Sequence, residues 1–281
     1  MKPVFHIGMI LLAVWAVATR AAEAAEPPAP VRASFLADVK AVKPGQSFDV
    51  GVLLHVDAGW HVYWENPGEA GAPTRARLAA PPGVKVSDLQ YPLPQEFNQA
   101  GDIKGYGYEG ELLLVARVTT PRDWPKGKPL VLTAQASWLS CSKDVCLPGK
   151  ANLDVSVGVG DEPENANSEL FAHWQPKLPL RVEDRTVPFM VTGPVADLNL
   201  RWQAIVGDVK AYPVPPDGVE VPRLAVDHAG QLTHIKPTLR LLGGEKQPGA
   251  VLGLLVTFTD DRGQHRGVRL SIPLRPQNPD R

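Results

Sequence analysis

Hydrophobic residues at every second position are the feature that most limits what this chain can fold into. The pattern recurs in several short segments, with polar residues between the apolar ones. The first clear row is Phe48, Val50, Val52, Leu54 and Val56. A period of two puts alternate side chains on opposite faces of a strand, so each segment indicates a strand with one buried and one solvated face. The chain is therefore predicted to be all-β.

Similar rows lie on both sides of an acidic stretch, Gly160 to Asn167. They are Leu130 to Trp138 and Ala151 to Val157 before it, then Leu198 to Ala204, Leu252 to Phe258 and Val268 to Leu274 after it. The chain is longer than one core usually organises, so two antiparallel β-sandwich domains are expected. We place them at residues 31–159 and 177–275, joined by a linker with a short helix at 160–176 and followed by a tail at 276–281.

The N-terminal residues predict export. Lys2 precedes an apolar run from Ile7 to Ala18, and Ala22-Glu23-Ala24 offers a cleavage site for a secretory signal. The run is shorter than the roughly 20 residues that a membrane-spanning helix needs. We therefore expect residues 1–24 to be a signal peptide, and the mature protein to be soluble, periplasmic and without a transmembrane segment.

Charge and motif content exclude several classes of function. The 29 basic and 30 acidic residues nearly cancel, which argues against nucleic-acid binding. The chain has no G-x-S-x-G, H-E-x-x-H or C-x-x-C motif, so we expect no metal, no bound cofactor and no thioredoxin-like site. Gly105 to Gly110 matches G-x-G-x-x-G, but Glu111 to Val118 alternates like a strand where a dinucleotide site needs a helix. We expect these glycines to form a flexible loop that leads into a hairpin.

The only two cysteines, Cys141 and Cys146, are the main chemical feature of the chain. Four residues separate them, and in an oxidising compartment such a pair is close enough to form a disulfide. A structural bridge is one interpretation, although so short a loop gives only about 2 kcal/mol of chain-entropy stabilisation. The other is an exchangeable disulfide, because the pair lies at the neck of a predicted hairpin and its polar loop should be exposed. Lys143, in that loop, could stabilise a thiolate or could simply be a solubilising side chain.

An aromatic cluster follows the first strand. Strand alternation puts Trp60, Val62 and Trp64 on one face, and His61 and Tyr63 on the other. The cluster could fill the core, or it could shield the sulfurs or contact a partner, since Tyr and Trp are enriched at interface centres.

Four segments together resemble a known family. They are Gly59-Trp-His-Val-Tyr-Trp64, Pro92-Leu-Pro-Gln-Glu-Phe97, Tyr106-Gly107, and Trp138-Leu-Ser-Cys141 through Cys146-Leu-Pro148. In this order they resemble the N-terminal periplasmic domain of DsbD and, more closely, the longer N-terminal region of its ScsB-like relatives. The resemblance covers roughly Ala33 to Val159, and the second domain is assigned by its position alone.

The resemblance implies immunoglobulin-like sandwiches and a thiol-disulfide oxidoreductase. In the family, the cysteine pair takes electrons from a membrane-embedded conductor and passes them to periplasmic disulfide isomerases, thioredoxin-like proteins or cytochrome c maturation factors. By similarity, Cys141 and Cys146 are the redox pair, and Cys146 is the first attacker. Trp60 and Tyr63 fall at the aromatic positions beside the pair. The loop Asp102 to Tyr108, with Tyr106 and Tyr108, falls where a cap covers the sulfurs.

This chain departs from the family pattern in three ways. Four residues separate the cysteines, where DsbD has five. The cap shows Gly105 before Tyr106 and no Phe at its tip. No conductor or thioredoxin-like domain is expected in this chain, so a separate polypeptide is the expected electron donor. Two other functions stay open. One is a partner- or glycan-binding sandwich with an inert disulfide and a platform of Trp60, Tyr63 and Trp64. The other is a structural subunit of a redox or copper-tolerance assembly.

Overall fold

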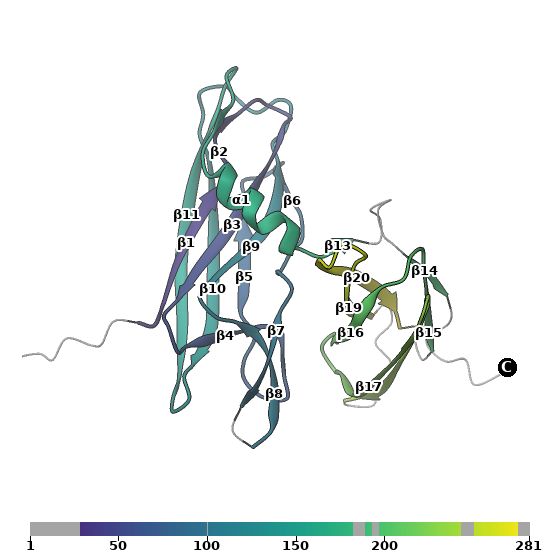
Figure 1. Cartoon of the computed structure of the whole chain (residues 1–281). Helices are drawn as coiled ribbons and strands as arrows, with labels where there is room; N and C mark the ends of the chain where they lie inside the picture. Colours follow the sequence, from purple (N-terminus) through teal and green to yellow (C-terminus); the bar gives the residue numbers. More distant parts are fainter. Residues whose placement is uncertain (1–28, 100, 182–188, 193–196, 243–249, 275–281) are drawn as a thin grey trace, which may run out of the picture.

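A computed structural model describes residues 29–99, 101–181, 189–192, 197–242 and 250–274. In this part of the chain the structure is built from mainly antiparallel sheets with one short helix, which confirms the all-β prediction (Figure 1). The predicted signal peptide, residues 1–24, and the predicted tail, 276–281, lie outside the described residues.

The first sandwich packs a four-stranded sheet against an eight-stranded sheet. The smaller sheet has the order β1 (Val31–Ala37), β3 (Ser47–Val56), β9 (Glu111–Thr119), β6 (Lys85–Val86). The larger has the order β12 (Glu164–Asn165), β2 (Val39–Val42), β11 (Cys146–Val159), β10 (Leu130–Cys141), β4 (His61–Gly68), β8 (Ile103–Tyr108), β7 (Gln95–Gln99), and β5 (Arg75–Ala79) also pairs with β10. The predicted apolar rows of β3 and β10 lie in the core between these two sheets.

The second sandwich follows the helix and is also made of two sheets. One has the order β13 (Leu180–Arg181), β20 (His265–Pro273), β19 (Val251–Thr259), β16 (Gly207–Val214). The other has the order β14 (Phe189–Thr192), β15 (Leu198–Trp202), β18 (Leu232–Leu241), β17 (Val219–Ala229). Its core contains the predicted residues Leu198, Leu200 and Trp202. Ala204 was expected in the same row but is exposed, because β15 ends at Trp202.

The short helix α1 (Ser168–Trp174) and the 3-10 turn η1 (Gln175–Lys177) cover the outer face of the smaller sheet (Figure 1). Phe171, Trp174 and Leu178 pack against Leu53 of β3 and two residues of β9. This face of β3 was expected to be solvated. It is covered because Leu53, among the polar residues of that face, gives the helix an apolar surface to bury.

Candidate functional site

The cysteines lie at the end of the longest hairpin of the first sandwich. Strands β10 and β11 pair along their whole length, and the last pair of this ladder is Cys141 opposite Cys146. The two residues have a Cα–Cα distance of 4.0 Å and form a disulfide. Cross-strand neighbours of this kind point to the same face, so the alternation that builds the hairpin also brings the sulfurs together.

The four residues of the hairpin tip are held by local hydrogen bonds. The Ser142 amide donates to the Val145 carbonyl at 2.8 Å. The Ser142 hydroxyl also accepts from the amides of Asp144 and Val145, at 3.3 and 3.2 Å. A serine side chain that binds backbone groups two and three residues ahead is a common turn stabiliser. These hydrogen bonds join the two strand ends in addition to the disulfide.

The two sulfur-bearing residues differ in their exposure to solvent. Cys141 is 2% exposed, whereas Cys146 is on the surface. The sequence led us to expect an exposed disulfide, and this is correct only for Cys146. Cys141 is buried because its strand, β10, is flanked at this point by β11 on one side and by β4 on the other. An incoming thiolate therefore has access to one sulfur and not to the other.

Tyr63 of β4 contacts the buried sulfur directly. Its hydroxyl lies 3.4 Å from Sγ of Cys141 and donates a hydrogen bond to it, and the Tyr63 ring itself is buried. Burial raises the pKa of Tyr63, and the nearby Gln99 side chain offsets this only in part. The phenol therefore stays protonated and remains a donor at neutral pH.

His61 lies directly across from Cys141, as its partner in the β4–β10 pairing. Its ring contacts Tyr63 edge-on at 5.2 Å and Phe97 at 4.4 Å between centroids. Nε2 of His61 is buried and has no hydrogen-bond partner among the described residues. Burial lowers the pKa of His61, and the charge of Glu109 only partly offsets this effect. The imidazole is therefore neutral at pH 7 and adds no charge next to the disulfide.

Phe97 is a residue of the site that the sequence analysis did not select. It lies on β7, which forms an antiparallel hairpin with β8. Its ring packs on the His61 ring, and its centroid lies 5.9 Å from that of the Tyr63 ring. The sequence shows no Phe at the tip of the cap, where Gly105 precedes Tyr106. Phe97 is instead the cross-strand partner of Gly105, so its ring occupies the space that a side chain at 105 would fill.

Gly105 and Gly107 were expected in a flexible loop, but both lie within strand β8. A Cβ at Gly107 would collide with the Val62 carbonyl of β4, and one at Gly105 with the Phe97 ring. These glycines are thus required for close packing of β8 against its two neighbouring strands. Strand β8 also does not form a hairpin with β9, because the chain crosses to the other sheet at Glu109 and Gly110.

Four of the predicted site residues lie away from the sulfurs or have other contacts. Trp60 is half-buried against the first core, on the opposite face of β4 from Tyr63, as strand alternation predicts. Tyr108 is buried and donates to the Pro92 carbonyl at 2.8 Å. Tyr106 packs on Tyr212 of the second sandwich. Lys143 is 88% exposed and pairs with Asp144. Of the aromatic and basic residues that we selected, Tyr63 alone has a hydrogen bond to a cysteine among the described residues.

The aromatic platform of the glycan-binding alternative is not formed. Tyr63 and Trp64 are each 1% exposed, and Trp60 packs on the core. A sugar-binding platform needs accessible ring faces, and these rings are covered by β8, β10 and the second sandwich. The exposed apolar side chains near the disulfide are instead Val145 and Leu147, which flank Cys146 and are 47% and 40% exposed.

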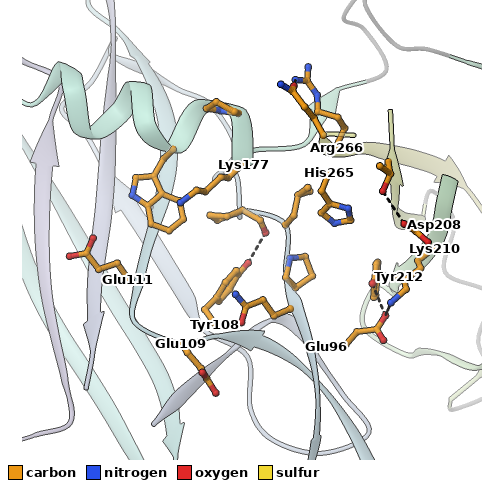
Figure 2. Close-up of a pocket in the computed structure, with 18 of the residues that line it drawn as sticks. Glu96, Tyr108, Glu109, Glu111, Lys177, Asp208, Lys210, Tyr212, His265 and Arg266 are labelled. Atoms are coloured by element: carbon orange, nitrogen blue, oxygen red, sulfur yellow. Dashed lines mark hydrogen bonds and ion pairs between the residues drawn. The ribbon is translucent and has the colours of Figure 1, made fainter. Parts of the chain in front are cut away.

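A cleft of about 1030 Å³ lies between the first sandwich, α1 and the second sandwich (Figure 2). Charges of both signs line it, including Glu96, Glu111, Lys177, Lys210 and Arg266. Neither cysteine lines the cleft, so it is separate from the disulfide. Among the described residues, no group of three or more His, Cys, Asp or Glu side chains is placed to hold a metal ion. In the same part of the chain, no helix has the length and apolar character needed to cross a membrane.

This fold and site define a class: a β-sandwich with a disulfide at the end of a hairpin, one sulfur exposed and the other covered by aromatic side chains. Residues 29–157 match the family model for the N-terminal region of the thiol:disulfide interchange protein DsbD. The first sandwich is therefore similar to the N-terminal domains of that family.

Solved structures extend the similarity to the second sandwich. The N-terminal periplasmic domain of ScsB from Proteus mirabilis is 20% identical, with a TM-score of 0.55, and the alignment covers 85% of this chain and 91% of that one. The reduced N-terminal domain of DsbD from Neisseria meningitidis is 16% identical over 47% of this chain and 90% of that one, with a TM-score of 0.26. No curated protein gives a significant sequence match. The likeness to the ScsB domain shows a shared fold over most of the chain.

Proposed function

We propose that this chain is an exported, periplasmic thiol-disulfide interchange module that passes reducing equivalents through Cys141 and Cys146. The observation that carries the proposal is the asymmetry of the disulfide. Cys146 is exposed, while the sulfur of Cys141 is buried and accepts a hydrogen bond from Tyr63. An attacking thiolate and a departing thiolate need these two different environments.

The exchange follows from this geometry in two steps. A thiolate of the partner attacks Sγ of Cys146, forms a mixed disulfide, and releases the electron pair of the broken S–S bond to Cys141. The Tyr63 hydroxyl, 3.4 Å from that sulfur, stabilises the thiolate as it leaves. The partner's second thiolate then attacks its own sulfur in the mixed disulfide and releases Cys146 as a thiolate. Two electrons have moved to this chain, and the partner is oxidised; the reverse sequence reduces a partner disulfide.

The partners that we propose are a separate membrane-embedded conductor and thioredoxin-like or disulfide isomerase proteins of the periplasm. Support comes from the family that the first domain resembles and from Val145 and Leu147, whose exposed side chains flank Cys146. Apolar side chains beside an exposed sulfur give an incoming protein a surface to bury as the mixed disulfide forms. Neither the reaction nor this contact requires a bound cofactor.

The reduction potential of the Cys141–Cys146 couple tests the proposal. The folded protein is equilibrated in glutathione or dithiothreitol buffers, and its redox state is read by alkylation and mass spectrometry. We expect a potential above about −300 mV, because inert structural bridges lie below this value. A lower potential, or a disulfide that opens only in denaturant, would favour a structural bridge instead.

A further inference from the structure

A contact between the two sandwiches lies on the far side of the hairpin that carries Phe97. On β7, Phe97 points toward His61 and Tyr63, and the preceding residue, Glu96, points the opposite way. Oε1 of Glu96 accepts hydrogen bonds from the Tyr212 hydroxyl at 2.6 Å and from Nζ of Lys210 at 3.2 Å (Figure 2). Both donors belong to β16 of the second sandwich.

Tyr212 contacts both strands of the hairpin at once. Glu96 of β7 and Tyr106 of β8 are cross-strand partners, and the Tyr212 ring meets the Tyr106 ring edge-on at 5.1 Å. The next cross-strand pair along the hairpin is Phe97 and Gly105, which lies over His61 and Tyr63. Tyr212 therefore holds the hairpin one residue away from the ring that packs on the redox site.

The hydroxyl of Tyr212 is suited to this contact. Tyr212 is 4% exposed, and burial together with the Glu96 carboxylate raises its pKa, so the phenol stays a donor. Burial alone would raise the pKa of Glu96, but the hydrogen bonds from Tyr212 and Lys210 outweigh it and lower the pKa, so the carboxylate stays charged. A donor to a charged acceptor is the stronger kind of hydrogen bond.

The second sandwich is also fixed to β4, the strand that carries Tyr63. Arg269 of β20 forms two hydrogen bonds with the Glu65 carboxylate. The Asn66 side chain donates to the Pro213 carbonyl at 2.6 Å. The Tyr212 ring meets the Trp64 ring edge-on, with 6.1 Å between the ring centroids. Because it binds β4 and the β7–β8 hairpin together, the second sandwich connects the two elements between which Phe97, His61 and Tyr63 are packed.

We propose that Tyr212 is a positioning residue for the redox site, which holds the β7–β8 hairpin against β4 through Glu96 and so keeps Cys141 covered while Cys146 stays open. The inference rests on the proposed exchange function, and it assigns a role to the second sandwich. That role is to determine which of the two sulfurs a thiol reagent or partner can reach.

The test uses the full chain and compares Tyr212→Phe with the wild type. Phenylalanine keeps the ring contacts with Tyr106 and Trp64 and removes only the hydroxyl that binds Glu96. Hydrogen exchange followed by mass spectrometry reports opening of the hairpin, residues 95–108. In the reduced protein, the ratio of iodoacetamide labelling at Cys141 to that at Cys146 reports shielding, with Cys146 as an internal reference. We expect both hydrogen exchange in the hairpin and this labelling ratio to rise about three- to tenfold, the range for the net contribution of a typical intramolecular hydrogen bond.

Three further variants make the result specific. Glu96→Ala removes this contact and also the Lys210 bond, so it should have at least the effect of Tyr212→Phe, and the double variant should have no larger effect than Glu96→Ala alone. Glu96→Gln keeps an oxygen acceptor but loses the charge, so its effect should lie between the wild type and Glu96→Ala. Thr233→Val removes a hydroxyl that bonds Trp202 and His228 in the second core, away from the hairpin, so it should leave both readouts unchanged.

The outcomes separate this inference from the function on which it rests. If the wild-type disulfide exchanges with dithiols but Tyr212→Phe and Glu96→Ala change neither readout, the positioning role is wrong and the exchange function stands. Faster hydrogen exchange in the hairpin with an unchanged labelling ratio also overturns the positioning role, because the hairpin then does not shield Cys141. A wild-type disulfide that does not react with dithiols contradicts the proposed function itself. Hydrogen exchange in the hairpin then still reports whether the contact between Tyr212 and Glu96 holds the hairpin in place.

Discussion

The Tyr63 hydroxyl donates a hydrogen bond to Sγ of Cys141 across the boundary between β4 and β10, at 3.4 Å. Both residues are almost completely buried, whereas the other sulfur of the disulfide belongs to an exposed residue. This contact is the only hydrogen bond to a cysteine sulfur among the described residues. It makes the two sulfurs chemically unequal before any partner arrives.

Tyr63→Phe should slow the opening of the disulfide by thiolates. The variant keeps the buried ring and removes the donor that stabilises the departing Cys141 thiolate. We expect the rate constant for reduction by glutathione to fall about tenfold, the effect of a hydrogen bond of about 1.4 kcal/mol to a charged group. Tyr91→Phe is the matched control, because its hydroxyl binds the Thr74 carbonyl and not a sulfur. Equal rates in all three proteins would show that the Tyr63 hydroxyl does not assist the reaction.

Single-cysteine variants should differ in how they trap partners. Cys141→Ser leaves the exposed Cys146 and should accumulate mixed disulfides in a periplasmic extract, visible on non-reducing gels. Cys146→Ser leaves only the 2% exposed Cys141 and should form few. The reason is access, since the remaining thiolate must reach a sulfur of the partner's disulfide to form the mixed disulfide. More adducts with Cys146→Ser than with Cys141→Ser would reverse the proposed order of attack.

Lys143→Ala should have little effect on exchange. The Lys143 side chain is 88% exposed and pairs with its neighbour Asp144 at 3.3 Å. Solvent and salt screen such a pair, so we expect the glutathione rate constant to stay within about a factor of two of the wild type. A large decrease at low and high salt alike would indicate that Lys143 stabilises a thiolate directly.

His61 should make stability depend on pH. Burial holds the pKa of His61 below its ordinary value of 6.5, so between these two values the unfolded chain binds a proton that the folded chain does not. The free energy of unfolding therefore falls as pH decreases through 6.5 and levels off below the folded pKa. Urea titrations at pH 7.5 and 5.0 should show a smaller decrease for His61→Phe than for the wild type. An equal decrease would mean that other groups cause it.

Gly107→Ala should destabilise the first sandwich by about 1–3 kcal/mol, the usual effect of overpacking a closely packed position. A Cβ there meets the Val62 carbonyl, which belongs to the backbone of β4 and cannot move aside easily. Gly160→Ala is the matched control, because a Cβ at that position has no neighbour within 4 Å. Denaturant unfolding of both variants gives the comparison, and similar midpoints would show that β8 can move away from β4.

Local patterns were sufficient for much of the fold and part of the site. Alternation predicts the rows of β3 and β10, and it also places Tyr63 and Trp60 on opposite faces of β4. Phe97 could not be found in this way, because its position depends on the register between β7 and β8 and on the pairing of β8 with β4. The sequence says nothing directly about such non-local pairings. The glycine at 105 was the available signal, since a glycine within a strand often marks a close approach.

The difference in burial between the cysteines was also beyond local patterns. Both belong to the same hairpin end, and spacing alone treats them as equivalent. Cys141 is covered because β4 pairs with the last residues of β10, Ser140 and Cys141. The coverage of β3 by α1 has the same origin, because Leu53 and Phe171 are far apart in the chain.

The hydrogen bonds made by Ser142 have a consequence for the lifetime of a complex. They close the hairpin tip by contacts other than the S–S bond, so we expect the ends of β10 and β11 to stay together after the bridge is cut. The freed Cys141 then remains beside Cys146 at a high effective concentration and can expel whatever protein is attached there. Under the proposed function, this arrangement would favour rapid release of a partner by intramolecular resolution.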